Sequence, residues 1–370
     1  MRKTSPPPIF PLPPVSVIKA EDFKREMEDE VLPALKKCRR DGWTRIKGEF
    51  CAVRGIKAAK PGEGFAHWVF YDASGFENSK RKAAFGAPLG TAVILIGFTQ
   101  SEVRFSELAW YFLQYGLSVL ILEHRGHGLS SREISDPEIV KASHWEDYRK
   151  DFAAVMEDAE KKGCLTRPLF LFAHSMGGAI GVSIEEAFPL FFDRAVLSSP
   201  MLLPKMKLPA FAMRAAAEFM CLIGKGDMRV PGSLGFAPPP SNRPPSYRLR
   251  DEWYFSKRLP SPLLHLSDPC CKWSREALRM DWEISRRESV KKILTPTLLF
   301  QAEKDCLVDP RAQDRFIEKA KKAGVPAWMF RVRGTRHEIF CSSPQTLSKY
   351  LATVIGFYFS ALHAAPRLVE

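Results

Sequence analysis

The sequence has no cysteine pair at C-x-x-C spacing, although it contains eight cysteines. Zinc sites commonly use such pairs, so the spacing argues against a structural zinc site. A chain of 370 residues is long enough to bury a core without a framework of disulfides. We therefore expect mostly free thiols in a reducing, cytoplasmic compartment, and neither a metal nor a cofactor.

Nucleic-acid-binding motifs are also missing: there is no RNP motif, no Cys/His finger and no basic region followed by heptads. The net charge of +13 is therefore not interpreted as a nucleic-acid site. The positive charge is consistent with peripheral binding to an anionic membrane, at its inner face. It is equally consistent with a basic surface that only contacts solvent.

Long apolar runs are scarce. The N-terminus begins with Arg2 and Lys3, but six prolines between positions 6 and 14 interrupt any signal-peptide core. We expect residues 1–19 to form an extended tail. The most apolar stretch begins at Tyr350; it is short and contains polar groups, so a buried terminal helix is expected rather than a membrane span.

What the chain does contain is an alternation of strand-like and helix-like segments. A charged amphipathic helix is expected over 20–40, then an antiparallel pair of strands over 49–56 and 66–73. The alternation that follows predicts an α/β fold, with a mostly parallel central sheet and helices on both faces. Six further strands are expected, over 91–98, 118–124, 169–174, 194–200, 295–302 and 327–334.

The alternation stops between residues 201 and 290, a stretch rich in proline, arginine and aromatic residues. It contains 15 Lys and Arg against 9 Asp and Glu. We expect an inserted cap at 201–290 between two parts of a hydrolase core, 20–200 and 291–370. Its apolar and basic side chains could line an acyl slot and meet lipid phosphates, or could simply cover the core with a solvated basic face.

The stretch LFLFAHSMGGAIG resembles a nucleophile elbow, with Ser175 at a sharp turn between strand and helix. The usual pentapeptide is G-x-S-x-G, whereas Ala173 stands at its first position here. Alanine adds only one methyl group at a position that must be small. The competing interpretation is a helix N-cap serine.

Two downstream loops supply the partners that a serine nucleophile needs. Asp305 follows one predicted strand and His337 follows the next, in the chain order Ser, acid, His of this fold. Asp309 precedes Pro310 and is expected to cap a helix instead. We therefore predict a Ser175–His337–Asp305 triad, with oxyanion donors in the backbone N–H groups of Met176 and of Phe98, in the loop after the stretch TAVILI.

Four motifs together, HRGHGLS, AHSMGG, QAEKDCLVDP and GTRHEIF, resemble the bacterial serine lysophospholipases of the L2 type. These belong to the monoacylglycerol lipase branch of the α/β-hydrolase superfamily. The resemblance extends from about residue 49 to near the C-terminus and implies a helical cap and hydrolysis of single-chain lipid esters. Glu123 departs from the aspartate common in the family, and is expected to have a scaffold role.

The function expected is therefore a serine ester hydrolase that acts on single-chain lipid esters through an acyl-enzyme, with lysophospholipids as the expected substrates. A monoacylglycerol lipase or a general carboxylesterase is the nearest alternative. A non-catalytic module that binds membranes on a hydrolase scaffold is a more distant one. His124 and His127 are interpreted as parts of a tight turn, because no carboxylate or cysteine lies at ligand spacing from them.

Overall fold

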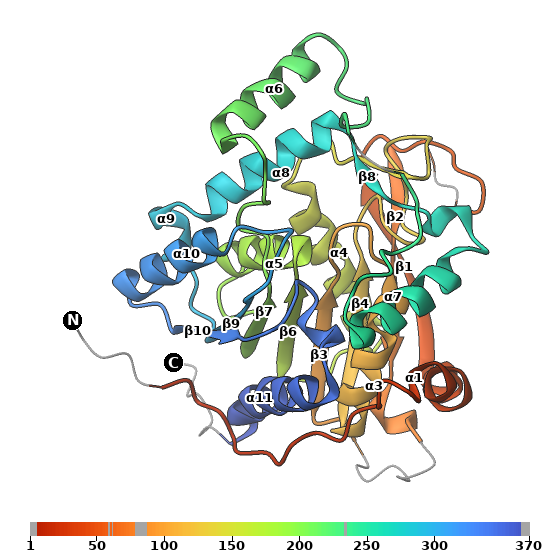
Figure 1. The fold of residues 1–370 in the computed structure, drawn as a ribbon, viewed down its shortest axis with the longest axis vertical. Coiled ribbons are helices and arrows are strands. Elements are labelled where there is room, and N and C mark those ends of the chain that lie inside the picture. The colour runs from red at the N-terminus through yellow and green to blue at the C-terminus, as the bar shows by residue number, and fades with distance from the viewer. Residues whose placement is uncertain (1–5, 58–59, 61, 78–86, 233–234, 364–370) are drawn as a thin grey trace.

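The computed structural model describes residues 6–57, 60, 62–77, 87–232 and 235–363. The expected tail at 1–19 and the second core part at 291–370 thus each extend beyond the described residues at one end. The centre of the molecule is an eight-stranded sheet in the order β1-β2-β4-β3-β6-β7-β9-β10 (Figure 1). Strand β2 runs opposite to the other strands of this sheet, so the predicted mostly parallel sheet is confirmed.

The central parallel strands β3, β4, β6 and β9 are mostly apolar because both faces of the sheet are covered there, whereas the edge strand β10 is only partly buried. In β3, Val93 and Leu95 point into one core, while Ala92 and Ile94 point into the other. The strands of the sheet are β1 (Arg39–Lys47), β2 (Glu63–Tyr71), β3 (Gly90–Leu95), β4 (Leu117–Glu123), β6 (Leu169–His174), β7 (Arg194–Ser198), β9 (Thr297–Ala302) and β10 (Ala327–Val332).

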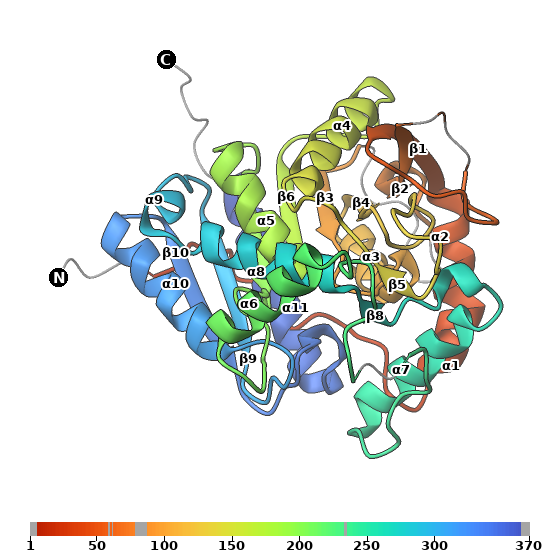
Figure 2. The ribbon, with the colours of Figure 1, turned by 90° about the horizontal axis from the view of Figure 1, so that it is seen from above.

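Helices from different parts of the chain cover each face, as Figure 2 shows from above. One core includes side chains of α4 (Asp147–Lys161), α5 (Met176–Ala187), α8 (Cys271–Ile284) and α10 (Pro310–Ala323). The other core includes side chains of α3 (Ser106–Gln114), α7 (Pro245–Arg258) and α11 (Pro344–Leu362). The terminal helix expected around Tyr350 is α11, which is buried along its inner face.

The predicted N-terminal helix and first strands need correction. The helix ends earlier than Arg40: α1 (Phe23–Glu26), a π-helical turn η1 (Met27–Val31) and α2 (Leu32–Cys38) lead directly into β1. Strand β1 pairs with β2 in the place expected for 49–56. Within 49–56 the structure has no strand beyond an isolated bridge between Cys51 and Arg132.

Residues 6–19 are extended, as predicted, but they are packed along the core. The Phe10 N–H donates to the carbonyl of Gly356 at 2.9 Å, and the Ser348 hydroxyl donates to the Val15 carbonyl. Position 356 of α11 requires a glycine. A Cβ atom there would lie 2.4 Å from the Phe10 carbonyl oxygen and would collide with it. The segment runs beneath α11 in Figure 1.

Residues 201–290 lie between β7 and β9 and are mostly helical. They contain α6 (Ala210–Leu222), α7, η4 (Pro262–Leu264), β8 (Asp268–Pro269), α8 and α9 (Arg287–Val290). The short strand β8 pairs with β5 (Ile139–Val140) from the preceding part of the chain. In Figure 1, α6 lies at the top of the view above α8, whereas α7 lies beside α1 and α3.

All eight cysteines are free thiols. Among the helices that the structure describes, none combines the length and the apolar character needed to cross a membrane.

Candidate active site

Ser175 occupies a strained turn between β6 and α5. Its φ of 53° and ψ of −118° lie in a region that side-chain-bearing residues rarely adopt. The turn is fixed by two hydrogen bonds, because the Ser175 N–H donates to the Ser198 carbonyl and the Ser175 carbonyl accepts from Met201. The strain therefore belongs to a rigid strand-turn-helix unit, which is the context a nucleophile elbow requires.

The crowding around this turn explains why alanine is tolerated at position 173. A Cβ atom at Gly177 would lie 2.3 Å from the Leu95 carbonyl, so that position must remain glycine. The Ala173 methyl group instead faces Gly181 of α5, where an added Cβ would lie only 3.0 Å away. Gly181, one helical turn after Gly177, therefore leaves room for the Ala173 methyl group.

The structure brings Ser175, His337 and Asp305 together from three loops. The His337 Nε2 atom lies 2.8 Å from the Ser175 hydroxyl, and its Nδ1 atom lies 2.7 Å from an oxygen of Asp305. All three side chains are largely buried. One imidazole thus contacts both the alcohol and the carboxylate, which is the geometry for removing a proton from a serine.

Asp305 is held as a carboxylate. Burial opposes its charge, but hydrogen bonds from His337 and from the backbone N–H groups of Leu307 and Val308 lower its pKa. Asp309 is not part of this group. It caps α10 by accepting a hydrogen bond from Arg311, as the sequence predicted.

The two predicted oxyanion donors come from different segments of the chain. Met176 is the first residue of α5, and Phe98 lies in the loop that follows β3. Neither backbone N–H has a partner among the described residues, whereas the N–H of Gly97 donates to the Gln100 side chain at 2.8 Å. The ring of Phe98 packs against Trp273 of α8, with centroids 4.3 Å apart.

A cavity of about 510 Å³ opens above Ser175 and His337. Its lining combines the loop after β3, the loops that hold Asp305 and His337, and side chains of α7 and α8. Four arginines line it together with two acidic residues, Asp251 and Glu338. The arginines are Arg104, Arg243, Arg258 and Arg336.

Two of these arginines have no carboxylate partner within the described ranges. Arg258 donates to the backbone carbonyls of Leu264 and Leu266, and burial together with the charge of Arg104 lowers its pKa. Arg336 directly precedes His337 in the chain, and its backbone N–H donates to the Tyr247 hydroxyl at 2.8 Å. Among the described residues, the cavity wall therefore carries two guanidinium groups that no carboxylate neutralises.

The polar residues that surround Ser175, His337 and Asp305 were not predicted from the sequence. Gln100 donates to Glu338 at 2.6 Å, and Glu338 in turn pairs with the buried Arg104. Burial opposes the charge of Glu338, but Arg104 lowers its pKa to about 2. The only sequence signal was that Glu338 follows the candidate histidine, because its partners are more than 230 positions away.

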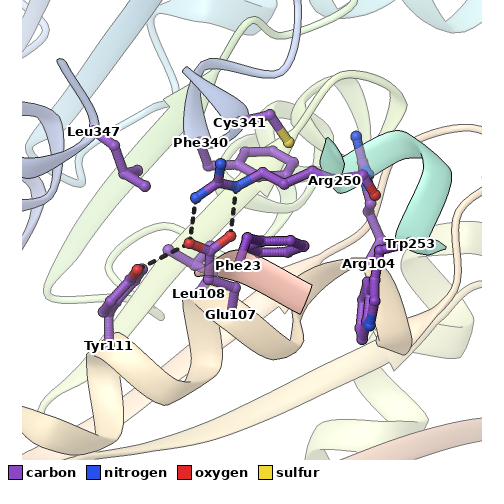
Figure 3. A pocket seen from close by; sticks show the side chains of 10 residues that line it. All are labelled: Phe23, Arg104, Glu107, Leu108, Tyr111, Arg250, Trp253, Phe340, Cys341 and Leu347. Atoms are coloured by element: carbon purple, nitrogen blue, oxygen red, sulfur yellow. Dashed lines mark hydrogen bonds and ion pairs between the residues drawn. The ribbon is translucent and has the colours of Figure 1, made fainter. Parts of the chain in front are cut away.

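Helix α7 is anchored next to this group by a second buried ion pair. Figure 3 shows Arg250 of α7 facing Glu107 of α3, with two parallel hydrogen bonds of 2.7 and 2.6 Å. The hydroxyl of Tyr111 donates to the same carboxylate at 2.9 Å. Because these groups are buried, the ion pair holds α7 in one register against the core.

The HRGHG turn has the structural role that the sequence predicted. His124 and His127 are fully buried, and burial lowers their pKa values to about 3 and about 4. Glu123 occupies the position where the resemblance led us to expect aspartate. One of its carboxylate oxygens lies 2.8 Å from the Nδ1 atom of His67. Its carboxyl group fills the space next to Gly128, where an added Cβ atom would lie 1.9 Å from it.

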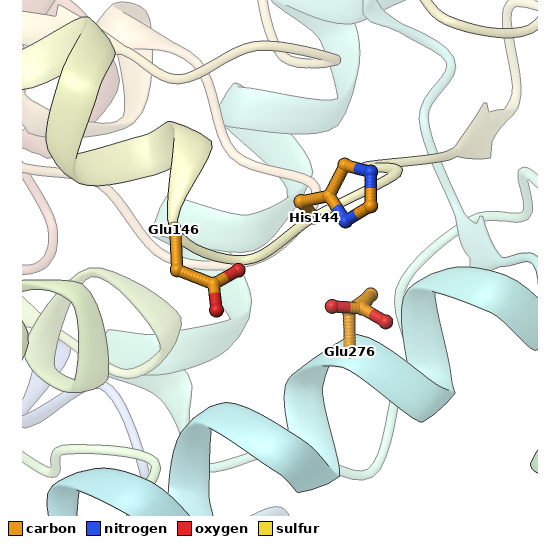
Figure 4. Close-up of side chains that lie close together, drawn as sticks. All are labelled: His144, Glu146 and Glu276. Atoms are coloured by element: carbon orange, nitrogen blue, oxygen red, sulfur yellow. The ribbon is translucent and has the colours of Figure 1, made fainter.

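One group of side chains has the spacing of a metal site. His144, Glu146 and Glu276 lie close together outside the cavity (Figure 4). Glu276, however, is buried and already pairs with Arg275 and Arg279 of its own helix. This carboxylate fastens α8 near the start of α4, and the three residues do not form a set of free ligands.

Comparison with known proteins identifies the family to which this chain belongs. The family described as "Serine aminopeptidase, S33" matches residues 86–343. The chain is 30% identical over 279 residues to "Lysophospholipase L2" of Escherichia coli (strain K12), covering 72% of this chain and 79% of that protein. It is 27% identical to the human "Monoglyceride lipase", covering 63% of this chain and 72% of that protein.

Solved structures agree with this relationship at the level of the fold. A monoacylglycerol lipase of Paleococcus ferrophilus superposes with a TM-score of 0.54 at 22% identity, over 74% of this chain and 95% of that one. A carboxyl esterase of Bacillus coagulans superposes with a TM-score of 0.63 at 14% identity, over 88% and 99%. The chain therefore belongs to the matched serine hydrolase family of the α/β-hydrolase superfamily.

Proposed function

We propose that this protein hydrolyses carboxylic esters of single-chain lipids, with lysophospholipids as its preferred substrates. The observation that carries the proposal is the contact of His337 with both Ser175 and Asp305 at the base of a cavity. The names of the relatives, lysophospholipase and monoglyceride lipase, support the substrate class.

The proposed reaction begins when the Ser175 oxygen bonds to the ester carbonyl carbon and its proton passes to His337 Nε2. The negative charge on the carbonyl oxygen is stabilised by the N–H groups of Phe98 and Met176. The ester C–O bond then breaks, and His337 returns the proton to the departing alcohol. Asp305 stabilises the imidazolium and fixes the tautomer throughout.

Water completes the cycle by attacking the acyl-serine. It gives one proton to His337 as its oxygen bonds to the acyl carbon, and that proton returns to Ser175 as the fatty acid leaves. Atoms and charges therefore balance without a metal or a cofactor in any step.

The two cavity arginines for which the structure describes no carboxylate partner support a lysophospholipid over a monoacylglycerol. A lysophospholipid carries a phosphodiester on its leaving alcohol, and a guanidinium is suited to bind phosphate oxygens. Arg258 and Arg336 line the cavity with no carboxylate partner in the part of the chain that the structure describes, so an anionic head group would neutralise them. The glycerol head of a monoacylglycerol has no such charge.

Helix α6 supports peripheral contact with an anionic membrane. Phe211, Phe219 and Leu222 are 78%, 59% and 80% exposed on it. Lys207 and Lys225 flank the helix. Apolar side chains that enter the interface and basic groups that meet anionic lipids are the features of a surface-bound helix.

The nucleophile is tested by labelling with a fluorophosphonate probe. We expect wild type to be labelled and Ser175→Ala to be inert, with thermal unfolding unchanged as the control for folding. Equal labelling of the two proteins would reject the assignment of Ser175. Liposome binding by an unlabelled wild type would favour the non-catalytic membrane module.

The head group is tested with lysophosphatidylcholine and a monoacylglycerol of the same acyl chain, compared by kcat/KM. We expect Arg336→Gln to lower kcat/KM about tenfold on the lysophospholipid, as loss of one charge-assisted hydrogen bond would. The monoacylglycerol should be affected less than threefold. Equal losses on both lipids would favour the monoacylglycerol lipase or the general carboxylesterase.

A further inference from the structure

A continuous chain of hydrogen bonds connects the loop after β3 to helix α7. It begins at the Gly97 N–H, which donates to the side-chain carbonyl of Gln100 at 2.8 Å. The Gln100 amide donates to Glu338 at 2.6 Å. Arg104 binds Glu338 and, at 2.6 Å, Asp251 of α7. We call Gln100, Glu338 and Arg104 the relay.

The first bond fixes the peptide that precedes Phe98. Gln100 has one carbonyl and one NH₂ group, and the Glu338 carboxylate can only accept a hydrogen bond. The NH₂ group must therefore face Glu338, which leaves the carbonyl to accept from Gly97. With the Gly97 N–H occupied, the next N–H along the chain, that of Phe98, remains for the substrate oxygen.

The second bond links this loop to the candidate base. Glu338 follows His337 directly, so a carboxylate held by Gln100 and Arg104 also fixes the backbone that carries the imidazole. Arg104 is 7% exposed, and its position is set by carboxylates on both sides. A buried charge held this way tolerates little displacement of either partner.

The far end of the relay lies on α7, which contacts the same loop twice. Asp251 accepts from Arg104, and the Tyr254 hydroxyl accepts from the Ser101 N–H at 2.9 Å. Asp251 also pairs with Arg243, which lines the cavity. A displacement of α7 would therefore disturb the loop through both contacts.

We propose that the relay consists of positioning residues that hold the Phe98 N–H and the His337 imidazole in register, and that this register depends on α7 being docked. The inference rests on the proposed function, since it assigns Phe98 and His337 their parts in ester hydrolysis. The relay does not contact the reacting atoms. Its effect is on turnover rather than on substrate binding.

Gln100→Leu tests the first bond, because it removes the acceptor of the Gly97 N–H at similar side-chain size. Losing an entire oxyanion donor costs about 10²–10³-fold in turnover, so a misplaced donor should cost about 10–100-fold in kcat. We expect KM to change less than about threefold. Affinity for a trifluoromethyl ketone, whose serine adduct carries an oxyanion, should fall in parallel with kcat.

Gln100→Glu is a sharper version with its own pH signature. Its carboxylate would face the Glu338 carboxylate and repel it, which raises the pKa of the introduced group. A protonated carboxyl group has one acceptor and one donor, as the amide has. The ratio of variant to wild-type kcat should therefore rise as pH falls, whereas the ratio for Gln100→Leu should stay flat.

Glu338→Gln and Asp251→Asn test the link to α7. Both are nearly isosteric, and each should lower kcat about 3–10-fold by weakening a charge-assisted bond. If the relay acts as one unit, the double variant should lose less than the product of the two single effects. They also keep the test available if a Gln100 variant does not fold.

The outcomes separate this inference from the proposed function. If wild type hydrolyses no ester and takes no fluorophosphonate, the proposed function fails. If wild type is active, and the Gln100 and Glu338 variants keep its kcat and its affinity for the ketone, only the relay is rejected. A loss of kcat that exactly follows a loss of thermal stability, without a pH-dependent recovery in Gln100→Glu, would also reject it.

Discussion

Helices α6 and α7 come from the same inserted stretch of chain, yet their environments are opposite. Helix α7 buries six residues, among them Arg250 and Asp251, which pair with carboxylate and guanidinium groups of the core. Helix α6 buries only Ala217 and leaves apolar side chains exposed. The insertion is therefore not uniform: α7 is part of the wall of the site, and α6 is an outer element that lies on α8.

The largest effect should come from breaking the anchor of α7. Arg250→Met leaves Glu107 buried without its partner, and the free energy of unfolding should fall by about 3–5 kcal/mol. Arg214→Met on α6 is the matched control. It removes a guanidinium stacked on Trp282, and should cost less than about 1 kcal/mol. Urea denaturation of the two variants checks the comparison, and similar losses would contradict it.

A somewhat smaller effect is expected from acid at the α7 side, through the ion pair of Glu338 with Arg104. Because Arg104 lowers the pKa of Glu338 from about 4.5 to about 2, this carboxylate stabilises the fold fully above pH 4.5. Its contribution, about 3 kcal/mol, is lost as pH falls toward 2.

Glu338→Gln removes the group that titrates, so its stability should fall less steeply than that of wild type between pH 4.5 and 2. Urea denaturation at several pH values measures both slopes. Parallel curves for the two proteins would show that the ion pair of Glu338 with Arg104 adds no stability.

Substitutions in α6 should have the smallest effect on the free energy of unfolding, but they should clearly weaken membrane binding. Phe211→Ser with Leu222→Ser should leave the free energy of unfolding within about 0.5 kcal/mol, because both side chains are exposed. Partition onto anionic liposomes should fall at least about tenfold.

The control for α6 is Leu294→Ser, which removes a half-exposed leucine outside the helix. It should bind liposomes as wild type does, and hydrolysis of a soluble p-nitrophenyl ester should be unchanged in both variants. If the double variant and the control lose binding equally, α6 has no special role at the membrane.

The sequence predicted the parallel sheet and the approach of three distant residues because those features have local signals. Apolar runs mark buried strands, and Ser175, Asp305 and His337 each follow one. Strand β1 was missed because Gly42 and Thr44, which point inward, are not hydrophobic. Gly42 is needed because the Trp68 indole lies where a side chain would be.

The relay was missed for a different reason. The role of a buried arginine or glutamine depends on the residues that it contacts. Arg104 binds Asp251 and Glu338, which are 147 and 234 positions away in the sequence. Ala173 was interpreted correctly as tolerable, but the reason lay in Gly181, eight residues further on. Contacts between two residues that are far apart in the sequence produce no periodic pattern, so they could not be predicted from it.

The extended segment along α11 has a consequence for how the chain folds. The Val15 carbonyl and the Ser348 hydroxyl that meet there are 333 positions apart. Domains fold as units during synthesis from the N-terminus, so the part of this early segment that packs on α11 cannot dock there until the final helix has emerged. Its docking therefore closes the second core as one of the last events of folding, and contacts of such high sequence separation slow that step.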